Sequence, residues 1–242
     1  MNIAIASIFR DSQRWRDKQI CQVDKYMAAY LPYHCDIYCL EGDSEDDTLA
    51  VLTEYEKREH PRIKLFKFDV KTQFLGSIED ATRISGIALA QETLRQQIPY
   101  DRYDYVLWIE SDIIVPSNFI SNLMAHLETS GADIIAPLVW IQQNGEPMFY
   151  DSWGYICNGQ RFPNHKKEKF LRRRKQLYHN MDSIGTCALM RSYVLSNTTF
   201  GTNGFRSFCE QAKENKYKIV CTTSPEVYIQ HPSTECIENR WI

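Results

Sequence analysis

Residues 105–112, Tyr-Val-Leu-Trp-Ile-Glu-Ser-Asp, constrain the fold of this chain more than any other segment. The apolar run is typical of a strand that is buried on both faces within a parallel sheet. It ends in Glu110 and Asp112, which point the same way on an extended segment because they are two residues apart. Ligands in open α/β sheets bind beyond the carboxyl ends of such strands. We therefore expect both carboxylates to face a binding site.

The two carboxylates favour a divalent cation as the ligand. No Lys or Arg stands beside them in the sequence. Mg²⁺ and Mn²⁺ both accept carboxylate oxygens and bridge to phosphate oxygens. Asp112 is the predicted direct ligand. The alternative is an acidic turn in which Asp112 caps the segment that follows.

Size and composition fit one catalytic domain. The chain has 242 residues, 43% of them hydrophobic, which suits an undivided α/β domain. A net charge of −3 argues against general binding of nucleic acid. No stretch approaches the roughly 18–20 apolar residues needed to cross a bilayer. Residues 2–8 are too short and too weakly flanked for a signal peptide and read as a first strand.

Cysteine usage points to a reducing compartment. The eight cysteines form no CxxC pair and show no zinc spacing, and several lie in predicted core segments. Free thiols that serve as small core residues favour a cytoplasmic location, although an even count also permits disulfides.

Strands and helices alternate over the first 140 residues, which predicts right-handed crossovers and a mostly parallel sheet flanked by helices. The expected strands are 2–8, 35–41, 62–68, 103–110 and 133–140. The expected helices are 13–31, one that starts near Ser44 or Asp46, 78–97 and 117–129. A smaller mixed β region follows Trp140, with strands near 184–190, 217–222 and 226–230 and a helix near 205–215.

Three segments carry a resemblance to the GT-A glycosyltransferases. Residues 41–48, Glu-Gly-Asp-Ser-Glu-Asp-Asp-Thr, look like the acidic turn of that class. Residues 110–112 look like its DxD motif, with Glu where Asp is commoner, and 181–191 resemble the Gly-containing strand after the acceptor loop. The resemblance implies a single GT-A (Rossmann-like) domain over 1–242, with a nucleotide-binding half at 1–112 and an acceptor-binding half at 113–242.

The implied activity is metal-dependent transfer of a sugar from a nucleotide-diphosphate sugar to a glycan or other hydroxyl acceptor. Within the class, residues 150–153 (Tyr-Asp-Ser-Trp) with 106–108 (Val-Leu-Trp) resemble the fungal mannan-polymerase and capsule-associated α-mannosyltransferases. That similarity makes GDP-mannose the first expected donor and a UDP-sugar the second.

The donor site is expected over the first two strands. Small side chains at Ala6 and Ser7 would let the base and ribose approach, with ordinary strand packing as the alternative. Glu41 would accept from a base N–H or a ribose hydroxyl, and Asp43 would do the same or shape the turn. Arg83 matches a basic position that reaches the donor phosphates, or is a solvated helix residue.

The resemblance also assigns roles around the metal. Glu110 would meet the ribose or a metal-bound water. His231 follows a short predicted strand, and neutral imidazole is a good Mn²⁺ ligand. We expect His231 to contact the metal or the diphosphate, with a loop hydrogen bond as the alternative.

The catalytic base is the least defined part of the prediction. Inverting members of the class carry a Glu-Asp pair before the late helix, and alignment places Gly204 and Phe205 at those positions. The missing pair favours retention, with Asp182 and Asp151 positioning the acceptor. Inversion with either of these as base is the alternative. Glu210 is a further candidate, or a solvated helix residue.

Two further features complete the prediction. The run 165–175 holds seven Lys and Arg residues, and is either a solvated face, a contact for an acidic acceptor or an anionic membrane surface, or a lid over the diphosphate. The rival functions are a nucleotidyltransferase and a non-catalytic carbohydrate-binding protein. The first is disfavoured because residues 7–11 contain no glycine.

Overall fold

The computed structural model describes residues 2–12, 22–69, 71, 81–143, 146–151, 153–161 and 176–231. Its strands are β1 (Ile3–Phe9), β2 (Asp36–Glu41), β3 (Ile63–Lys67), β4 (Tyr105–Ile109), β5 (Ile134–Ala136), β6 (Val139–Gln143), β7 (Glu146–Phe149), β8 (Ile156–Cys157), β9 (Gln160–Arg161), β10 (Tyr178–Asn180), β11 (Cys187–Arg191), β12 (Ile219–Thr222) and β13 (Ile229–Gln230). Its helices are α1 (Gln22–Tyr30), α2 (Thr48–Arg58), α3 (Ala81–Gln97), α4 (Phe119–Ser130), α6 (Ser192–Ser196) and α7 (Phe205–Glu214), with 3₁₀ turns η1 (Tyr100–Arg102) and η2 (Pro225–Val227).

An eight-stranded sheet in the order β10-β12-β5-β11-β4-β1-β2-β3 forms the centre of the protein. Strands β1, β2, β3 and β4 pair in parallel, as do β5 and β12. Strand β11 runs antiparallel to both β4 and β5, and β10 runs antiparallel to β12. The predicted fold class is confirmed, since the central sheet is mostly parallel and two smaller sheets, β13-β6-β7 and β8-β9, lie in the C-terminal half of the chain.

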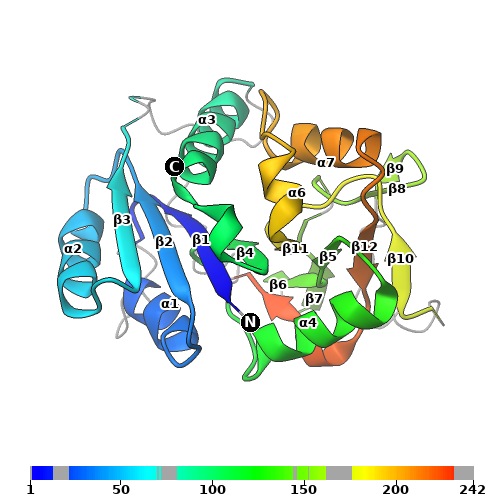
Figure 1. Cartoon of the computed structure of the whole chain (residues 1–242), viewed down its shortest axis with the longest axis horizontal. Helices are drawn as coiled ribbons and strands as arrows, with labels where there is room; N and C mark the ends of the chain where they lie inside the picture. The colour runs from blue at the N-terminus through cyan, green and yellow to red at the C-terminus, as the bar shows by residue number, and fades with distance from the viewer. Residues whose placement is uncertain are drawn as a thin grey trace.

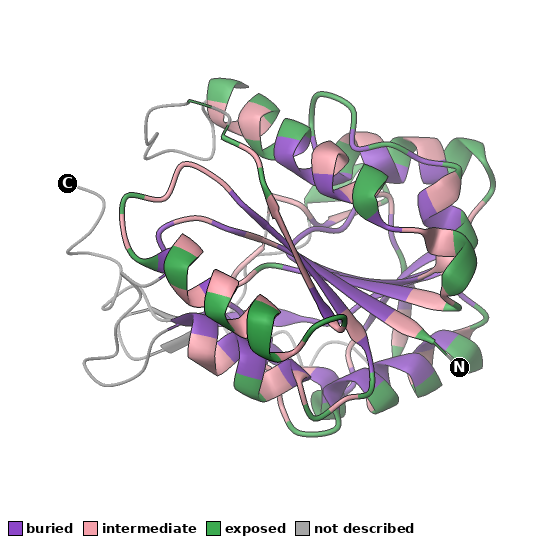
Figure 2. Ribbon diagram, turned by 60° about the vertical axis from the view of Figure 1, so that its left-hand side comes forward, coloured by how far each residue is buried: buried purple, intermediate pink, exposed green. Residues whose placement is uncertain are grey.

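Helices cover both faces of this sheet, and the two faces have separate cores (Figure 1). On β1, Ala4 and Ala6 face the core beneath α3, α6 and α7, while Ile5 and Phe9 face the core beneath α1, α2 and α4. The alternation follows from the two-residue period of a strand. Figure 2 shows the buried strands between helices that turn their exposed residues outward. Burial of both faces explains the continuous apolar run in β4.

The predicted strand 133–140 is wrong as a single element. It divides at Pro137, so that β5 lies in the central sheet and β6 in a three-stranded sheet with β7 and β13. Proline has no N–H to donate to a ladder, and the chain changes sheets there. Of the predicted helix 13–31, the part from Gln22 to Tyr30 is described and helical. Strands β7 to β10 and helix α6 were not predicted.

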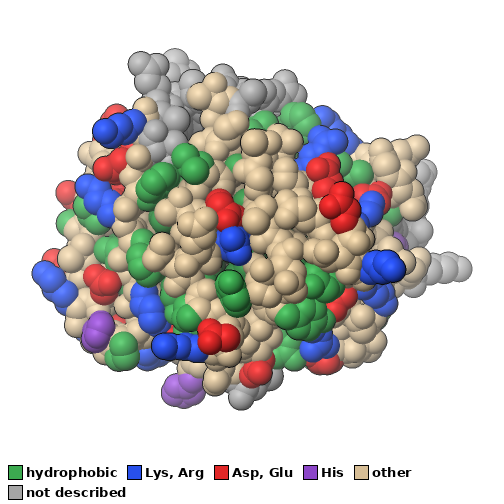
Figure 3. Space-filling model, turned by 45° about the horizontal axis from the view of Figure 1, so that its top comes forward, with side chains coloured by type: hydrophobic (Ala, Val, Ile, Leu, Met, Phe, Trp, Pro, Cys, Tyr) green, Lys and Arg blue, Asp and Glu red, His purple; other side chains and the backbone are tan. Residues whose placement is uncertain are grey.

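Surface charge and sulfur chemistry agree with the composition. Cys35, Cys39, Cys157, Cys187, Cys209 and Cys221 are free thiols, while residues 21 and 236 lie outside the described part. Acidic and basic side chains are mixed over the described area of the face in Figure 3. Within the described ranges, no helix combines the length and apolarity that a membrane span requires.

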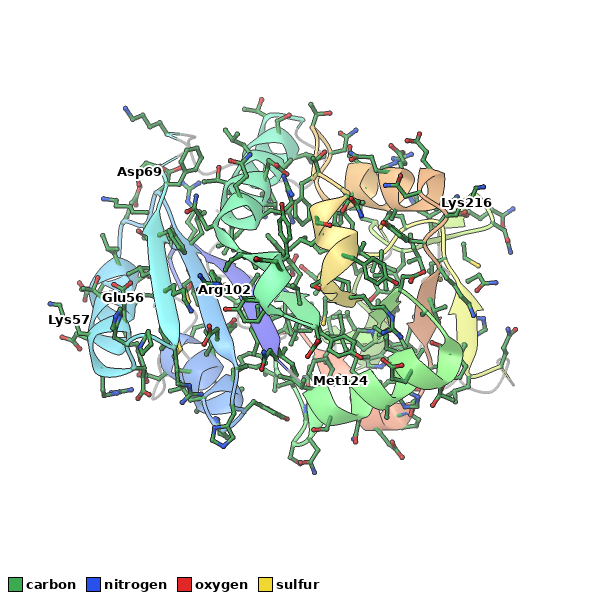
Figure 4. All side chains as sticks on the ribbon, in the orientation of Figure 1. Glu56, Lys57, Asp69, Arg102, Met124 and Lys216 are labelled. Atoms are coloured by element: carbon green, nitrogen blue, oxygen red, sulfur yellow. The ribbon has the colours of Figure 1, made fainter. Side chains whose placement is uncertain are left out.

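The labelled side chains in Figure 4 show how the helices frame the sheet. Glu56 and Lys57 mark α2 beside the β3 edge, and Lys216 marks the end of α7 at the far side. Glu56 also accepts a hydrogen bond from the Leu65 N–H at 2.9 Å, which ties α2 to β3. Met124 lies on α4, on the opposite side of the sheet from α3 and α7.

Candidate active site

The loop after β4 and the chain end of β13 bring Asp112 and His231 together. Ile114 and Gln230 exchange two backbone hydrogen bonds at 2.8 and 2.9 Å. The His231 N–H donates to the Trp140 carbonyl at 2.7 Å, so the histidine is held from both sides. Its Nε2 lies 3.1 Å from Asp112 Oδ2. Two residues that are 119 positions apart in the sequence therefore form one pair.

This pair fits a divalent cation. Asp112 Oδ1 is buried and has no hydrogen-bond partner among the described residues. A buried carboxylate oxygen without a donor is costly unless something positive meets it. Carboxylate and imidazole are both ligands of Mn²⁺, and carboxylate suits Mg²⁺. No three His, Cys, Asp or Glu side chains in the described ranges are grouped closely enough to hold a metal. Two protein ligands would leave the other positions to diphosphate oxygens and water.

Glu110 lies beside this pair. Its backbone N–H donates to the Thr186 carbonyl at 3.0 Å, which fixes the end of β4 against the start of β11. Part of the Glu110 residue is exposed to solvent, but many protein atoms lie around its carboxyl group. Loss of surrounding water, followed by the nearby carboxylates of Asp112 and Asp151, raises the pKa of Glu110 to about 8. Asp112 and Asp151 are near enough for their charges to act on Glu110, which favours a cationic partner.

Asp151 occupies a slot between two glycines. A Cβ on Gly154 would lie 2.8 Å from Asp151 Oδ1, and one on Gly185 would lie 2.4 Å from Oδ2. The carboxylate accepts hydrogen bonds from the Gly154 N–H at 2.8 Å and the Thr186 hydroxyl at 2.7 Å. Burial raises the pKa of Asp151, and these two donors offset part of that rise.

Tyr150 and Arg83 complete this group. The Tyr150 ring stacks on His231, with centroids 3.9 Å apart and planes at 21°. Burial raises the pKa of Tyr150, and the charges of Glu110 and Asp112 add to that rise. Arg83, in the first turn of α3, has its pKa lowered by burial, with Tyr150 and Glu110 close enough to counter the shift. The structure thus places a cation beside the carboxylates, where anionic phosphates would otherwise meet only acids.

Two of the predicted nucleotide-binding residues, Glu41 and Asp43, lie at and just after the end of β2. Glu41 is buried; its Oε1 accepts from the Ser44 N–H at 3.2 Å, and its Oε2 has no hydrogen-bond partner in the described chain. A carboxylate oxygen without a donor retains its capacity to accept a hydrogen bond. Asp43 has φ 59° and accepts from the Lys71 N–H at 3.0 Å, so it shapes the turn.

Ala6 and Ser7 are both fully buried within β1. The Ser7 hydroxyl shares a hydrogen bond with the Tyr26 hydroxyl at 2.6 Å and donates to the Ile109 carbonyl at 2.6 Å. These bonds join β1 to α1 and β4. The Ser7 side chain is thus engaged in strand packing, which was the alternative reading of this residue.

Two predicted catalytic candidates have other partners. Asp182 Oδ1 lies 2.5 Å from Lys213 Nζ, and its Oδ2 accepts from the Gly159 N–H at 2.8 Å. The Lys213 hydrogen bond lowers the pKa of Asp182. Glu210 is exposed on the outer face of α7, 3.7 Å from Arg206. The structure does not bring either acid to the group around Asp112.

Four contributing residues were not predicted. Gln22 Nε2 donates to the Ser111 carbonyl at 2.9 Å and so holds the acidic loop against α1. Thr186 joins Glu110 to Asp151. Gly154 and Gly185 make room for the Asp151 carboxylate. The glycine after residues 150–153 and the one in the 181–191 segment were visible in the sequence, but the contact between them was not. The basic run 165–175 lies entirely outside the described residues.

A separate hollow of about 300 Å³ lies at the opposite edge of the sheet, where β4 begins and β11 ends. Tyr103, Asp104, Tyr105, Arg191, Ser192 and Tyr193 line it. Its polar groups bond to the protein: the Tyr105 hydroxyl donates to Glu128 at 2.6 Å, and Arg191 donates to the same carboxylate at 3.0 Å. The carboxylate group at the other edge is therefore the stronger candidate for chemistry.

Solved structures of known proteins share the fold of this chain. S. aureus TarS 1–349 in complex with UDP-GlcNAc superposes with a TM-score of 0.58 at 14% identity, over 96% of this chain and 58% of TarS. GalNAc-T7 with UDP, GalNAc and Mn²⁺ superposes with a TM-score of 0.63 at 15% identity, over 96% of this chain and 43% of GalNAc-T7. The chain thus spans about half the length of these proteins.

The family comparison identifies the family of the chain, which the shared fold alone does not. No curated protein sequence is significantly similar to the chain. The family model "Glycosyl transferase family 2" matches residues 23–199, which include β4, the acidic loop, Asp151 and Thr186. This chain belongs to glycosyl transferase family 2.

Proposed function

We propose that this protein transfers a sugar from a nucleotide-diphosphate sugar to a hydroxyl acceptor. One observation carries the proposal: in a family 2 chain, Asp112 with its unpartnered Oδ1 stands 3.1 Å from His231, beside Glu110 and Asp151. Residues 1–112 form the nucleotide-binding half in this proposal, and 113–242 the acceptor-binding half.

Each side chain has a task that its surroundings support. Asp112 and His231 would hold Mn²⁺ or Mg²⁺, which would supply positive charge to stabilise the leaving diphosphate. Glu110 meets the ribose or a metal-bound water. Arg83 approaches the phosphates from α3. Glu41 Oε2 accepts from a base N–H or a ribose hydroxyl, because its other oxygen already accepts from Ser44.

The donor is the next part of the proposal. The TarS complex contains UDP-GlcNAc and the GalNAc-T7 complex contains UDP. These bound nucleotides support a UDP-sugar as the first donor to test. GDP-mannose remains the donor that the similarity to the α-mannosyltransferases favours. Metal-dependent hydrolysis of a panel of nucleotide sugars distinguishes the two.

Replacing Asp112 tests the proposed metal site. Asp112→Ala removes the carboxylate that meets the cation, so transfer should be abolished, and excess chelator should do the same to the wild type. Circular dichroism checks that the fold persists. Asp101→Ala is the matched control, because Asp101 is an exposed acid in η1. Full activity in excess chelator would refute the metal assignment.

The stereochemical course is a separate prediction. Gly204 and Phe205 begin α7 where an acidic pair would serve inversion, so we expect retention and an α-linked product from an α-linked donor. Asp151 favours the alternative, inversion, because a carboxylate of raised pKa close to Glu110 suits a general base. The anomeric proton coupling of the product decides: a β-linkage would refute retention and make Asp151 or Asp182 the leading candidate for the general base.

A further inference from the structure

We propose that Thr186 is a positioning residue of the active site, which holds the Asp151 carboxylate and the end of β4 in a fixed relation. The inference rests on the proposed sugar transfer. It concerns a residue that touches neither the metal ligands nor the donor in the proposal above, and it follows from three features of the same residue.

The first feature is a pair of contacts made by one residue. The Thr186 carbonyl accepts from the Glu110 N–H at 3.0 Å, and its hydroxyl donates to Asp151 Oδ2 at 2.7 Å. Thr186 itself is 4% exposed. The backbone of Thr186 therefore fixes the acidic segment after β4, while its side chain fixes an acid from the segment after β7. Both acids depend on where this one residue lies.

The second feature is the backbone conformation of Thr186. Its φ is 51°, in the left-handed region. A β-branched residue is a genuine outlier there, whereas glycine adopts this region without a steric penalty. A turn into β11 would be formed more easily by glycine. A threonine in this conformation indicates that its hydroxyl makes a contact that glycine cannot make, and strain of this kind is concentrated at functional sites.

The third feature is the way in which Asp151 is held. Its two oxygens each accept one hydrogen bond, Oδ1 from the Gly154 N–H and Oδ2 from Thr186. Gly154 and Gly185 leave no more room than the carboxylate needs. Without the Thr186 hydroxyl, a buried oxygen loses its donor, and the carboxylate must turn to find another. The direction in which Asp151 points is thus set by Thr186.

Three variants distinguish the effect of the Thr186 hydroxyl from the effect of the strained Thr186 backbone. Thr186→Ser keeps the hydroxyl and should keep kcat within about threefold of the wild type. Thr186→Val keeps the shape but loses the donor, so kcat should fall about 10-fold to 100-fold, as for other residues that orient a catalytic group. The donor KM should change little. Thr186→Gly should lose as much kcat as Thr186→Val, with a melting temperature at or above that of the wild type because the strain is relieved.

Thr198→Val is the matched control. Thr198 is also buried, and its hydroxyl donates to the Val194 carbonyl at 2.7 Å at the end of α6. This variant should melt earlier and keep the wild-type kcat. A purely structural role for Thr186 would give the same pattern in Thr186→Val, with a lower melting temperature and unchanged kcat, and would overturn the proposal.

The outcomes distinguish this inference from the function on which it rests. An active wild type with an equally active Thr186→Val refutes the positioning role alone. A wild type that transfers no sugar from any donor refutes the proposed function. In that case crystal structures of the wild type and Thr186→Val still decide on the positioning role: an Asp151 carboxylate turned out of the slot between Gly154 and Gly185 supports it, and an unmoved carboxylate overturns it.

Discussion

At the scale of single residues, the contacts of two aspartates distinguish candidates that the sequence could not separate. Asp151 and Asp182 were both candidates to position the acceptor or act as base. Asp151 is enclosed, its pKa is raised by burial, and it lies close to Glu110 and Asp112. Asp182 is paired with Lys213, which lowers its pKa and weakens it as a base. The neighbours of each carboxylate therefore make Asp151 the stronger candidate of the two.

We expect Asp151→Asn to affect mainly kcat and Asp182→Asn to affect mainly stability. Asp151→Asn should lower kcat by about 10²-fold or more, the usual range for a lost acid–base or orienting carboxylate. Asp182→Asn should leave kcat within a few-fold and reduce the free energy of unfolding by about 0.2–1 kcal/mol, as expected for a partly exposed ion pair. Steady-state kinetics and urea melts measure both effects. Equal losses of kcat would return Asp182 to the active site.

At the scale of elements, α3 connects the active site to the helices beyond it. Its first turn carries Arg83, and its last turns carry Glu92 and Arg95. Glu92 pairs with Arg95 at 2.7 Å and accepts from the Phe200 N–H at 3.1 Å. Arg95 also donates to the Leu195 carbonyl at 3.1 Å. These bonds fasten α3 to α6 and to the segment that leads into α7.

The Glu92 contacts predict a pH-dependent contribution to stability. Partial burial alone would raise the pKa of Glu92, but hydrogen bonds from Arg95 and the Phe200 N–H outweigh it and lower the pKa below its usual 4.5. A depressed carboxyl pKa stabilises the fold above the unfolded-state value, and that stability is lost as the pH falls through the folded-state value. Glu92→Gln should therefore cost about 1–2 kcal/mol near neutral pH and progressively less below about pH 4.5. Urea melts of both proteins over this range test it, and a difference that did not change with pH would contradict it.

At the scale of the whole molecule, the candidate site lies at one edge of the central sheet, whereas most of the described cysteines lie in the interior. The carboxyl ends of β1, β2 and β4 carry the site, while most of the described cysteines pack within the two cores. Burial raises the pKa of the Cys35 thiol to about 11 and that of Cys209 to about 12. Cys39 is shifted upward by burial as well. Since the thiolate is the reactive form, the fold protects these residues twice, by access and by protonation.

Alkylation of the native protein tests this protection. At about pH 8, peptide mapping should show Cys157 modified first among the six described cysteines, because it alone of them is only partly buried. Cys35, Cys39 and Cys209 should react only once denaturant unfolds the chain. Rapid native labelling of Cys39 would show that the core opens far more readily than this packing implies. A disulfide among the six would contradict their assignment as free thiols.

Features that depend on residues close together in the sequence were predicted well. Features that depend on contacts between distant segments were predicted less well. The apolar run of β4 and the acids after it are local in the chain, and their position in the centre of the sheet was predicted correctly. The break at Pro137 was also a local signal, but its effect was a change of sheet that the apolar pattern on both sides concealed. Strands as short as β8 and β9 have two residues each, too few for a period to be seen.

The sequence by itself determined the fold class, because hydrophobic periodicity and strand ends are properties of neighbouring residues. The location of the site after β4 stays a prediction. Tertiary structure alone decided which side chains meet there. Asp112 and His231 come together because β13 pairs with β6 and Gln230 bonds to Ile114 in the loop after β4. Thr186 bonds to both Asp151 and Glu110, which come from segments distant in the chain. A hydrogen bond depends on distances of about 3 Å between groups far apart in the chain, and no local pattern encodes such a distance.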